Sequence, residues 1–215
     1  MSFPEYLTYQ WDDLIEVAIG HMAVVLISLA IATAIGVTLG ILTYRRPAAA
    51  QVALAVASTI LTIPSFALFG IAIGIGLGLG YPPTIAVLTG YAILAILRNT
   101  ITGLRSVDSA IIESAKGMGM SNWQQLVRIE LPMAWPVIIA GVRVSALLIL
   151  GIATIAAYVG GPGFGEEIFT GLSTLGGVNA LNQVLSGMLG VIVLALVFEV
   201  LFAIFGRFTT SKGLN

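Results

Sequence analysis

Long apolar stretches alternate with short polar segments along the whole chain. Five of the stretches reach the length of about 20 apolar residues that a helix needs to cross the hydrocarbon core of a bilayer. The pattern predicts an all-α polytopic integral membrane protein in which residues 1–215 form a single transmembrane domain. The five predicted transmembrane helices are Val17–Tyr44, Val52–Leu79, Thr84–Leu104, Val137–Tyr158 and Val184–Phe205.

Pro64 interrupts the second of these stretches. Proline lacks a backbone N–H and clashes with the preceding turn, so a helix kinks or breaks where proline occurs. The stretch is therefore either one kinked helix or two short helices, and the sequence leaves both open.

Composition supports lipid as the surrounding solvent. Hydrophobic residues make up 58% of the chain and charged residues only 9%, with a mean hydropathy of +1.05. Soluble domains carry roughly 25% charged residues, so too little charge is present here to cover a surface that faces water. The chain has no cysteine and a single histidine, His21. Disulfides and thiolate sites are excluded, and no metal site is expected.

The basic residues indicate the orientation, because loops on the cytoplasmic side carry the excess of Lys and Arg. If five helices are threaded with the N-terminus outside, all nine basic residues lie inside. Splitting the second stretch into two complete spans would separate the first and last basic clusters. The sequence therefore predicts an external N-terminus and a cytoplasmic C-terminus, with Asp12, Asp13, Glu16, Glu166 and Glu167 outside. The basic residues are Arg45, Arg46, Arg98, Arg105, Lys116, Arg128, Arg143, Arg207 and Lys212.

The segment 105–136 is the only sizeable polar segment on the inner side, and it reads as two short helices. Asp108 is the expected N-cap of the first, and glycines after Lys116 end it. The second opens at Ser121 with an S-x-x-Q capping box. We expect Pro132 to stop the second helix, since the residue before a proline disfavours the helical conformation.

A spaced motif in this segment is specific. It comprises Glu113-Ser114-Ala115, Gly119 and Ile129-Glu130-Leu131-Pro132. The motif resembles the E-A-A-x₃-G-x₉-I-x-L-P signature of ABC importer permeases, with Ser114 in place of the second alanine. Each residue alone has an ordinary alternative: a solvated Glu113, a helix-ending Gly119, or an interfacial Trp123. The resemblance implies a type I permease core whose coupling helix contacts an ATPase through Glu113, Ser114, Ala115, Gly117, Gly119, Met120, Trp123, Ile129, Leu131 and Pro132.

Further segments are similar to the permeases of osmoprotectant importers, which carry glycine betaine, choline, carnitine or proline betaine. These segments are 62–69, 98–100, 117–120 and 154–165, and the similarity covers about residues 17–208. A quaternary ammonium accepts no hydrogen bonds, so aromatic faces are its natural contacts. Candidate residues of the translocation pathway are Pro64, Ser65, Phe66, Phe69, Tyr91, Asn99, Thr154 and Tyr158.

The chain contains no G-x-x-x-x-G-K-[ST] phosphate loop, so it is expected to have no ATPase site of its own. The resemblance implies two partner ATPase subunits that bind ATP and Mg²⁺, a second permease subunit that is the same or a different chain, and an external substrate-binding protein. We expect no cofactor on this chain, no nucleic-acid partner, and a location in a bacterial or archaeal cell membrane. The outer segment 159–183 is the expected external gate and docking site, through Glu166 and Glu167.

Two alternatives remain. One is an importer permease for another small polar solute, such as an amino acid. The other is an ion-coupled secondary transporter, which would need an ion site inside the membrane. Glu199 lies inside the fifth predicted helix, and we favour a structural ion pair with a basic residue near the inner face over an ion-coupling role.

Overall fold

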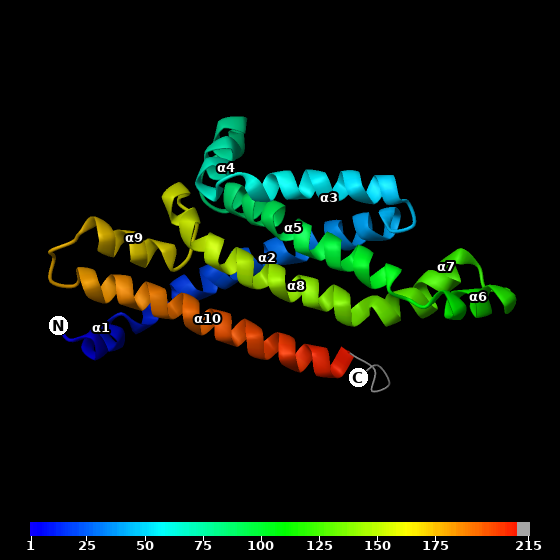
Figure 1. Ribbon diagram of the computed structural model, residues 1–215. Coiled ribbons are helices and arrows are strands. Elements are labelled where there is room, and N and C mark those ends of the chain that lie inside the picture. The colour runs from blue at the N-terminus through cyan, green and yellow to red at the C-terminus, as the bar shows by residue number, and fades with distance from the viewer. Residues whose placement is uncertain (210–215) are drawn as a thin grey trace.

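The computed structural model describes residues 1–209, which form helices joined by short turns (Figure 1). The prediction of an all-α fold is confirmed. The α-helices are α1 (Phe3–Tyr9), α2 (Trp11–Thr43), α3 (Pro47–Thr62), α4 (Ser65–Ala72), α5 (Tyr81–Arg105), α6 (Ser109–Gly117), α7 (Asn122–Gln125), α8 (Leu131–Ala153), α9 (Gly165–Ser173) and α10 (Ala180–Thr209). Three shorter elements are the π-helical turns η1 (Ile73–Leu77) and η2 (Leu126–Glu130) and the 3₁₀ turn η3 (Thr154–Val159).

Four helices are long and apolar enough to cross a membrane, and a broken pair makes up to five. The four are α2, α5, α10 and the continuous helix Asn122–Val159. The fifth is α3 followed by Ser65–Leu77, bent by 98° at the break. Pro64 therefore separates two helices with a sharp turn between them. The hydroxyl of Tyr91 donates a hydrogen bond to the backbone carbonyl of Ile63. This bond gives a partner to a carbonyl that has none in the helix because of the break.

One predicted boundary is wrong. Pro132 does not stop the second helix of the segment 105–136, because the helix that begins at Asn122 runs on to Val159. The π-helical turn η2 precedes the proline, and the N–H of Leu131 bonds to the carbonyl of Leu126 five residues back. This wider turn and the position of Pro132 at the start of α8 let the chain pass the proline without losing helical direction.

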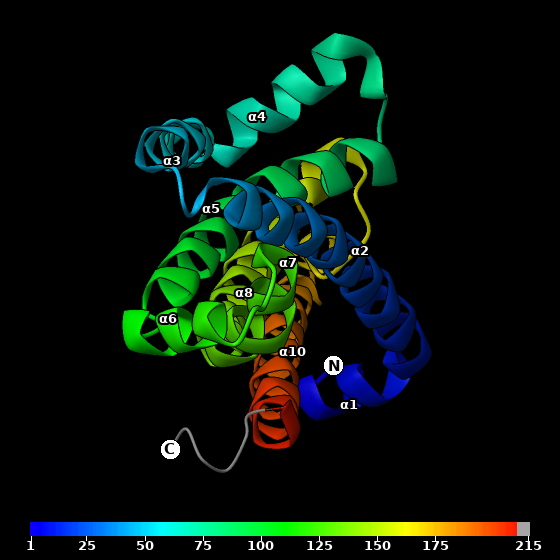
Figure 2. The same cartoon turned by 90° about the vertical axis from the view of Figure 1, so that its right-hand side faces the viewer.

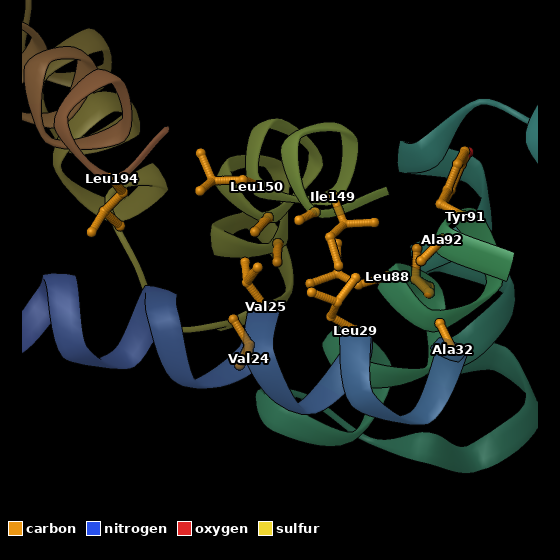
Figure 3. Close-up of a cluster of buried hydrophobic side chains, with 14 of the residues drawn as sticks. Val24, Val25, Leu29, Ala32, Leu88, Tyr91, Ala92, Ile149, Leu150 and Leu194 are labelled. Atoms are coloured by element: carbon orange, nitrogen blue, oxygen red, sulfur yellow. The ribbon is translucent and has the colours of Figure 1, made fainter. Parts of the chain in front are cut away.

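Helix α5 is the centre of the subunit, packed between α2 and α8 (Figure 1). Small residues set the close approach of α2 to α5, since a Cβ at Gly36 would lie 2.9 Å from Ile96 and one at Gly40 would lie 2.5 Å from Thr100. Figure 3 shows the apolar core between the three helices, where Val25, Leu29, Leu88, Ile149 and Leu150 meet.

Helix α10 lies at the edge of the bundle and leaves most of its apolar surface exposed. The two ends of the molecule differ. Figure 1 shows α1, α9 and the start of α10 near one end, and α6, α7 and the turn between α2 and α3 at the other. Figure 2 looks onto this second end, with α6 and α7 in front. Any site at one end is therefore separated from the other by the length of the bundle.

Candidate functional site

The elbow, residues 108–132, is shaped by local signals. The Asp108 carboxylate accepts a hydrogen bond from the Ala110 N–H at 2.9 Å, which caps α6. At the start of α7, the Ser121 N–H donates to Gln124 Oε1 at 2.8 Å and the Gln124 N–H donates to Ser121 Oγ at 3.3 Å. Both predicted caps are confirmed. Between them Gly119 adopts φ +80°, a left-handed conformation that favours glycine.

The elbow presents a polar and apolar surface that the rest of the described chain, residues 1–209, leaves exposed. Six of the residues that the sequence assigned to coupling are exposed: Glu113, Ser114, Gly117, Gly119, Trp123 and Pro132. Met120, Ile129 and Leu131 are half-buried, and Ala115 is fully buried. Met118, beside Gly119, was not singled out from the sequence and is 73% exposed. Trp123, on the other arm of the elbow, is 70% exposed. A methionine flanked by two glycines was the available signal.

Glu130 is a second residue that the sequence analysis did not assign. Its side chain is only 1% exposed, and its carboxylate accepts from the Tyr44 hydroxyl and pairs with Arg45 Nη2 at 2.8 Å. Arg105 Nε donates to the Tyr44 carbonyl at 2.8 Å. Burial and the adjacent Glu130 carboxylate raise the pKa of Tyr44 above its ordinary range. The contacts attach the end of the elbow to the turn after α2, beside a hollow of about 410 Å³.

A charged pair joins two of the membrane-crossing helices. Glu199 of α10 forms an ion pair with Arg143 of α8, so the ion pair expected for Glu199 is present. The pair is not enclosed by the subunit, since the Arg143 side chain is 46% exposed and the Glu199 side chain 32%. Charged side chains inside a membrane normally face protein or water rather than lipid. This face of α8 and α10 therefore requires a covering other than lipid tails.

The eight residues predicted to line a pathway separate into two groups. Phe69 and Tyr91 belong to the core and present no ring to an outside solute. The others are at least partly exposed: Pro64, Ser65, Phe66, Asn99, Thr154 and Tyr158. Within this group Phe66 and Tyr158 are in contact, with ring centroids 5.3 Å apart, and Phe169 of α9 lies 4.2 Å from Tyr158. Phe169 was not singled out from the sequence.

The Gly-rich start of the outer segment 159–183 is held by a buried histidine. The Phe164 N–H donates to His21 Nδ1 at 3.2 Å, which leaves the ring proton on Nε2, 3.1 Å from the Leu150 carbonyl. A Cβ at Gly163 would lie 2.5 Å from His21 Nδ1, and one at Gly165 would lie 1.8 Å from the Thr154 carbonyl oxygen. These glycines are therefore required by close packing against α2 and η3.

The two acidic residues predicted to dock a partner differ in their surroundings. Glu166 is exposed, whereas Glu167 is half-buried and accepts from the Tyr6 hydroxyl at 3.1 Å. Burial raises the pKa of Glu167, and burial with the nearby Glu167 charge raises the pKa of Tyr6 to about 12. Both carboxylates line a hollow of about 580 Å³, together with Asp13 and Glu16.

Comparison with known proteins identifies the family. Residues 17–211 match the family described as binding-protein-dependent transport system inner membrane component. The chain belongs to this family. As a member, it is an ABC importer permease, a multi-pass membrane subunit with a role in transport. Membership also implies that an ATPase and a substrate-binding protein work with it.

Several permeases resemble this family member along most of its length. It is 35% identical over 195 residues to the glycine betaine/carnitine/choline transport system permease protein OpuCB of Bacillus subtilis, covering 91% of this chain and 88% of the relative. It is 41% identical over 179 residues to the carnitine transport permease protein OpuCB of Listeria monocytogenes, covering 83% and 80%. It is 34% identical over 211 residues to the choline transport system permease protein OpuBB of Bacillus subtilis, covering 98% and 95%.

Solved structures share the permease fold. A chain of the inward-facing MetNI methionine ABC transporter superposes with a TM-score of 0.81 at 22% identity, covering 98% of this chain and all of that chain. At this identity the likeness supports the fold alone. It confirms the expectation of an ABC importer permease core.

Proposed function

We propose that this permease carries quaternary-amine osmoprotectants such as glycine betaine, carnitine and choline. The observation that carries the proposal is the 34–41% identity to three permeases named for these solutes, over 83–98% of the chain. The aromatic side chains Phe66 and Tyr158, exposed and in contact, are compatible with such a solute.

Transport then proceeds by alternating access between two permease subunits that line a shared pathway. The exposed pair Arg143–Glu199 supports a second subunit, because a neighbouring permease or a water-filled pathway would shield these charges from lipid. Pathway residues proposed on the exposed side of the subunit are Pro64, Ser65, Phe66, Asn99, Thr154 and Tyr158.

The elbow is the proposed contact with the ATPase, with one ATPase subunit for each permease. Met118 and Trp123 are the most exposed large apolar side chains of the elbow, where Ile111 and Val127 are exposed as well, and such a surface suits a groove on a partner. ATP and Mg²⁺ would bind to the ATPase. Closure of the ATPase pair on ATP would move the elbow, and Glu130 would pass this movement to the turn after α2.

The elbow end is proposed to face the cytoplasm and the N-terminus to lie outside. Arg45, Arg105 and Lys116 lie at or beside the elbow and its hollow, and an excess of basic residues is typical of cytoplasmic loops. Reporter fusions after Arg46, Gly80, Trp123 and Thr174 should read inside, outside, inside and outside. The exposed Glu166 is the proposed contact for the binding protein on the outer side.

The proposal is tested by uptake in a host that lacks its own osmoprotectant importers. Cells that express this permease with its ATPase and binding protein should accumulate radiolabelled glycine betaine, carnitine or choline. Excess unlabelled quaternary amine should compete, and excess methionine or histidine should not. Accumulation of an amino acid in place of all three amines would contradict the proposed substrate class.

A further inference from the structure

We propose that Phe66, Tyr158 and Phe169 form a subsite of the permease that contacts the quaternary ammonium group of the solute by cation–π interaction. The inference deepens the proposed function and rests on it. The three residues are called the aromatic cluster below.

The aromatic cluster is assembled from three separate elements. Phe66 lies in the first turn of α4, immediately after the break at Pro64, while Tyr158 is in η3 and Phe169 is in α9. The Phe66 and Tyr158 rings meet edge to face at 89° with centroids 5.3 Å apart. The Tyr158 and Phe169 rings are tilted by 58° with centroids 4.2 Å apart. At these separations the rings pack against one another, so a quaternary ammonium would contact the exposed surfaces of Phe66 and Tyr158.

Packing inside the subunit leaves two rings of the aromatic cluster largely exposed. Phe66 and Tyr158 are each 60% exposed, whereas Phe69, three residues after Phe66, is fully buried in the core. The Tyr158 hydroxyl has no hydrogen-bond partner among the described residues 1–209. The aromatic faces are thus available to a ligand that needs no hydrogen bond, and a quaternary ammonium is such a ligand.

The charge on this side of the subunit favours a cation. Phe169 lies on the same short helix as Glu166 and Glu167, which line the 580 Å³ hollow with Asp13 and Glu16. No lysine or arginine lines this hollow. The four carboxylates raise the local concentration of cations around α9, the helix that carries Phe169, and exposed aromatic rings favour the alkylated, weakly hydrated ones.

Uptake by the whole importer provides the first test. The permease, its ATPase and its binding protein are reconstituted in vesicles of phosphatidylethanolamine and phosphatidylglycerol, which contain no quaternary ammonium. We expect Tyr158→Leu and Phe66→Leu each to raise KM for radiolabelled glycine betaine or choline about tenfold. Tyr158→Phe, which keeps the ring, should stay within about twofold of the unmodified protein. Tyr9→Leu removes an exposed tyrosine outside the cluster and should change nothing.

A second test does not depend on which solute is transported. The chain has no cysteine, so Ala67→Cys places a single thiol next to Phe66 at an exposed position. The thiol is labelled with a methanethiosulfonate that carries a trimethylammonium group and, separately, with a neutral hydroxyethyl reagent. The labelling rate with the trimethylammonium reagent, divided by the rate with the neutral reagent, should fall about tenfold when Tyr158→Leu is added. The same ratio should stay unchanged when Tyr158→Phe is added.

The outcomes separate the inference from the proposed function. Uptake of quaternary amines with an unchanged KM and rate ratio in the leucine variants would overturn the aromatic subsite alone. A ring-dependent rate ratio without uptake of any quaternary amine would overturn the proposed function and leave the subsite. Equal losses in Tyr158→Phe and Tyr158→Leu would also overturn the subsite, because the ring would not be the contact. Added phosphatidylcholine that slows labelling only when the ring is present would assign the subsite to a lipid headgroup and overturn its role with the solute.

Discussion

The elbow and the outer segment are both short, glycine-rich regions at opposite ends of the bundle, and they use glycine differently. In the elbow, Gly117 and Gly119 have no atom within 4 Å of the position where a Cβ would stand. In the outer segment, Gly163 and Gly165 are pressed against His21 and Thr154. The outer segment is completed by this chain's own helices, whereas the elbow leaves open space that a partner can occupy. Substitutions in the elbow should therefore impair the contact with the ATPase, whereas substitutions in the outer segment should lower the stability of the fold.

The largest effect is expected from Gly119→Glu and Glu113→Lys in the elbow. Each should reduce uptake to background and prevent co-purification of the ATPase, because an unpaired charge buried in a partner's groove costs several kcal/mol. Gly176→Glu is the matched control, since Gly176 has φ +95° and open space around it like Gly119 but lies in the outer segment. The Gly176→Glu variant should still co-purify with the ATPase. Normal uptake by both elbow variants would show that the elbow is not the coupling site.

Gly165→Ala should have the next largest effect, and on folding. Its Cβ would stand 1.8 Å from the Thr154 carbonyl oxygen, so the outer segment must shift at a cost of about 3 kcal/mol. Gly117→Ala meets nothing within 4 Å and should be neutral or slightly stabilising. Thermal unfolding in detergent measures both. Equal midpoints for the two variants would contradict the difference drawn between the two ends.

Glu130→Gln and Tyr44→Phe should weaken the attachment of the elbow without removing its surface. We expect uptake per ATP hydrolysed to fall roughly tenfold, since a hydrogen bond to a buried charged group contributes about 1.5–3 kcal/mol. The ATPase should still co-purify. Arg46→Gln, at the exposed neighbour of Arg45, is the control. The double variant should be little worse than either single one, and fully additive losses would mean that the two residues act separately.

The smallest effect concerns pH at the outer end. Burial raises the pKa of Glu167 above its ordinary value of 4.5, so the folded state holds this proton more tightly than the unfolded chain does. The resulting stabilisation is complete below about pH 4.5 and is lost as pH rises through the raised pKa. Glu167→Gln should flatten this part of the pH dependence of thermal unfolding. Glu166→Gln should flatten it less, because this change removes only the neighbouring charge that adds to the raised pKa of Glu167.

The sequence predicted the features that depend on neighbours along the chain. Apolar length located the membrane-crossing helices, and the caps at Asp108 and Ser121 were readable because their partners lie two or three residues away. Contacts between distant residues were not readable. Glu130 pairs with Arg45 across 85 positions, and Glu167 meets Tyr6 across 161. The wrong helix end predicted at Pro132 has the same origin. The local preference of the residue before a proline favours a helix end there, whereas the contact of α8 with the distant α5 favours a helix that runs on.

The break at Pro64 also sets a length that the surrounding lipid must match. Helix α3 has 16 residues, which gives it a length of about 24 Å, against about 30 Å for the hydrocarbon core. Its neighbours α2 and α5 are long enough to cross with residues to spare. A span this short is accommodated by local thinning of the bilayer, by flanking side chains that reach the interface, or by a second subunit that covers α3 in place of lipid.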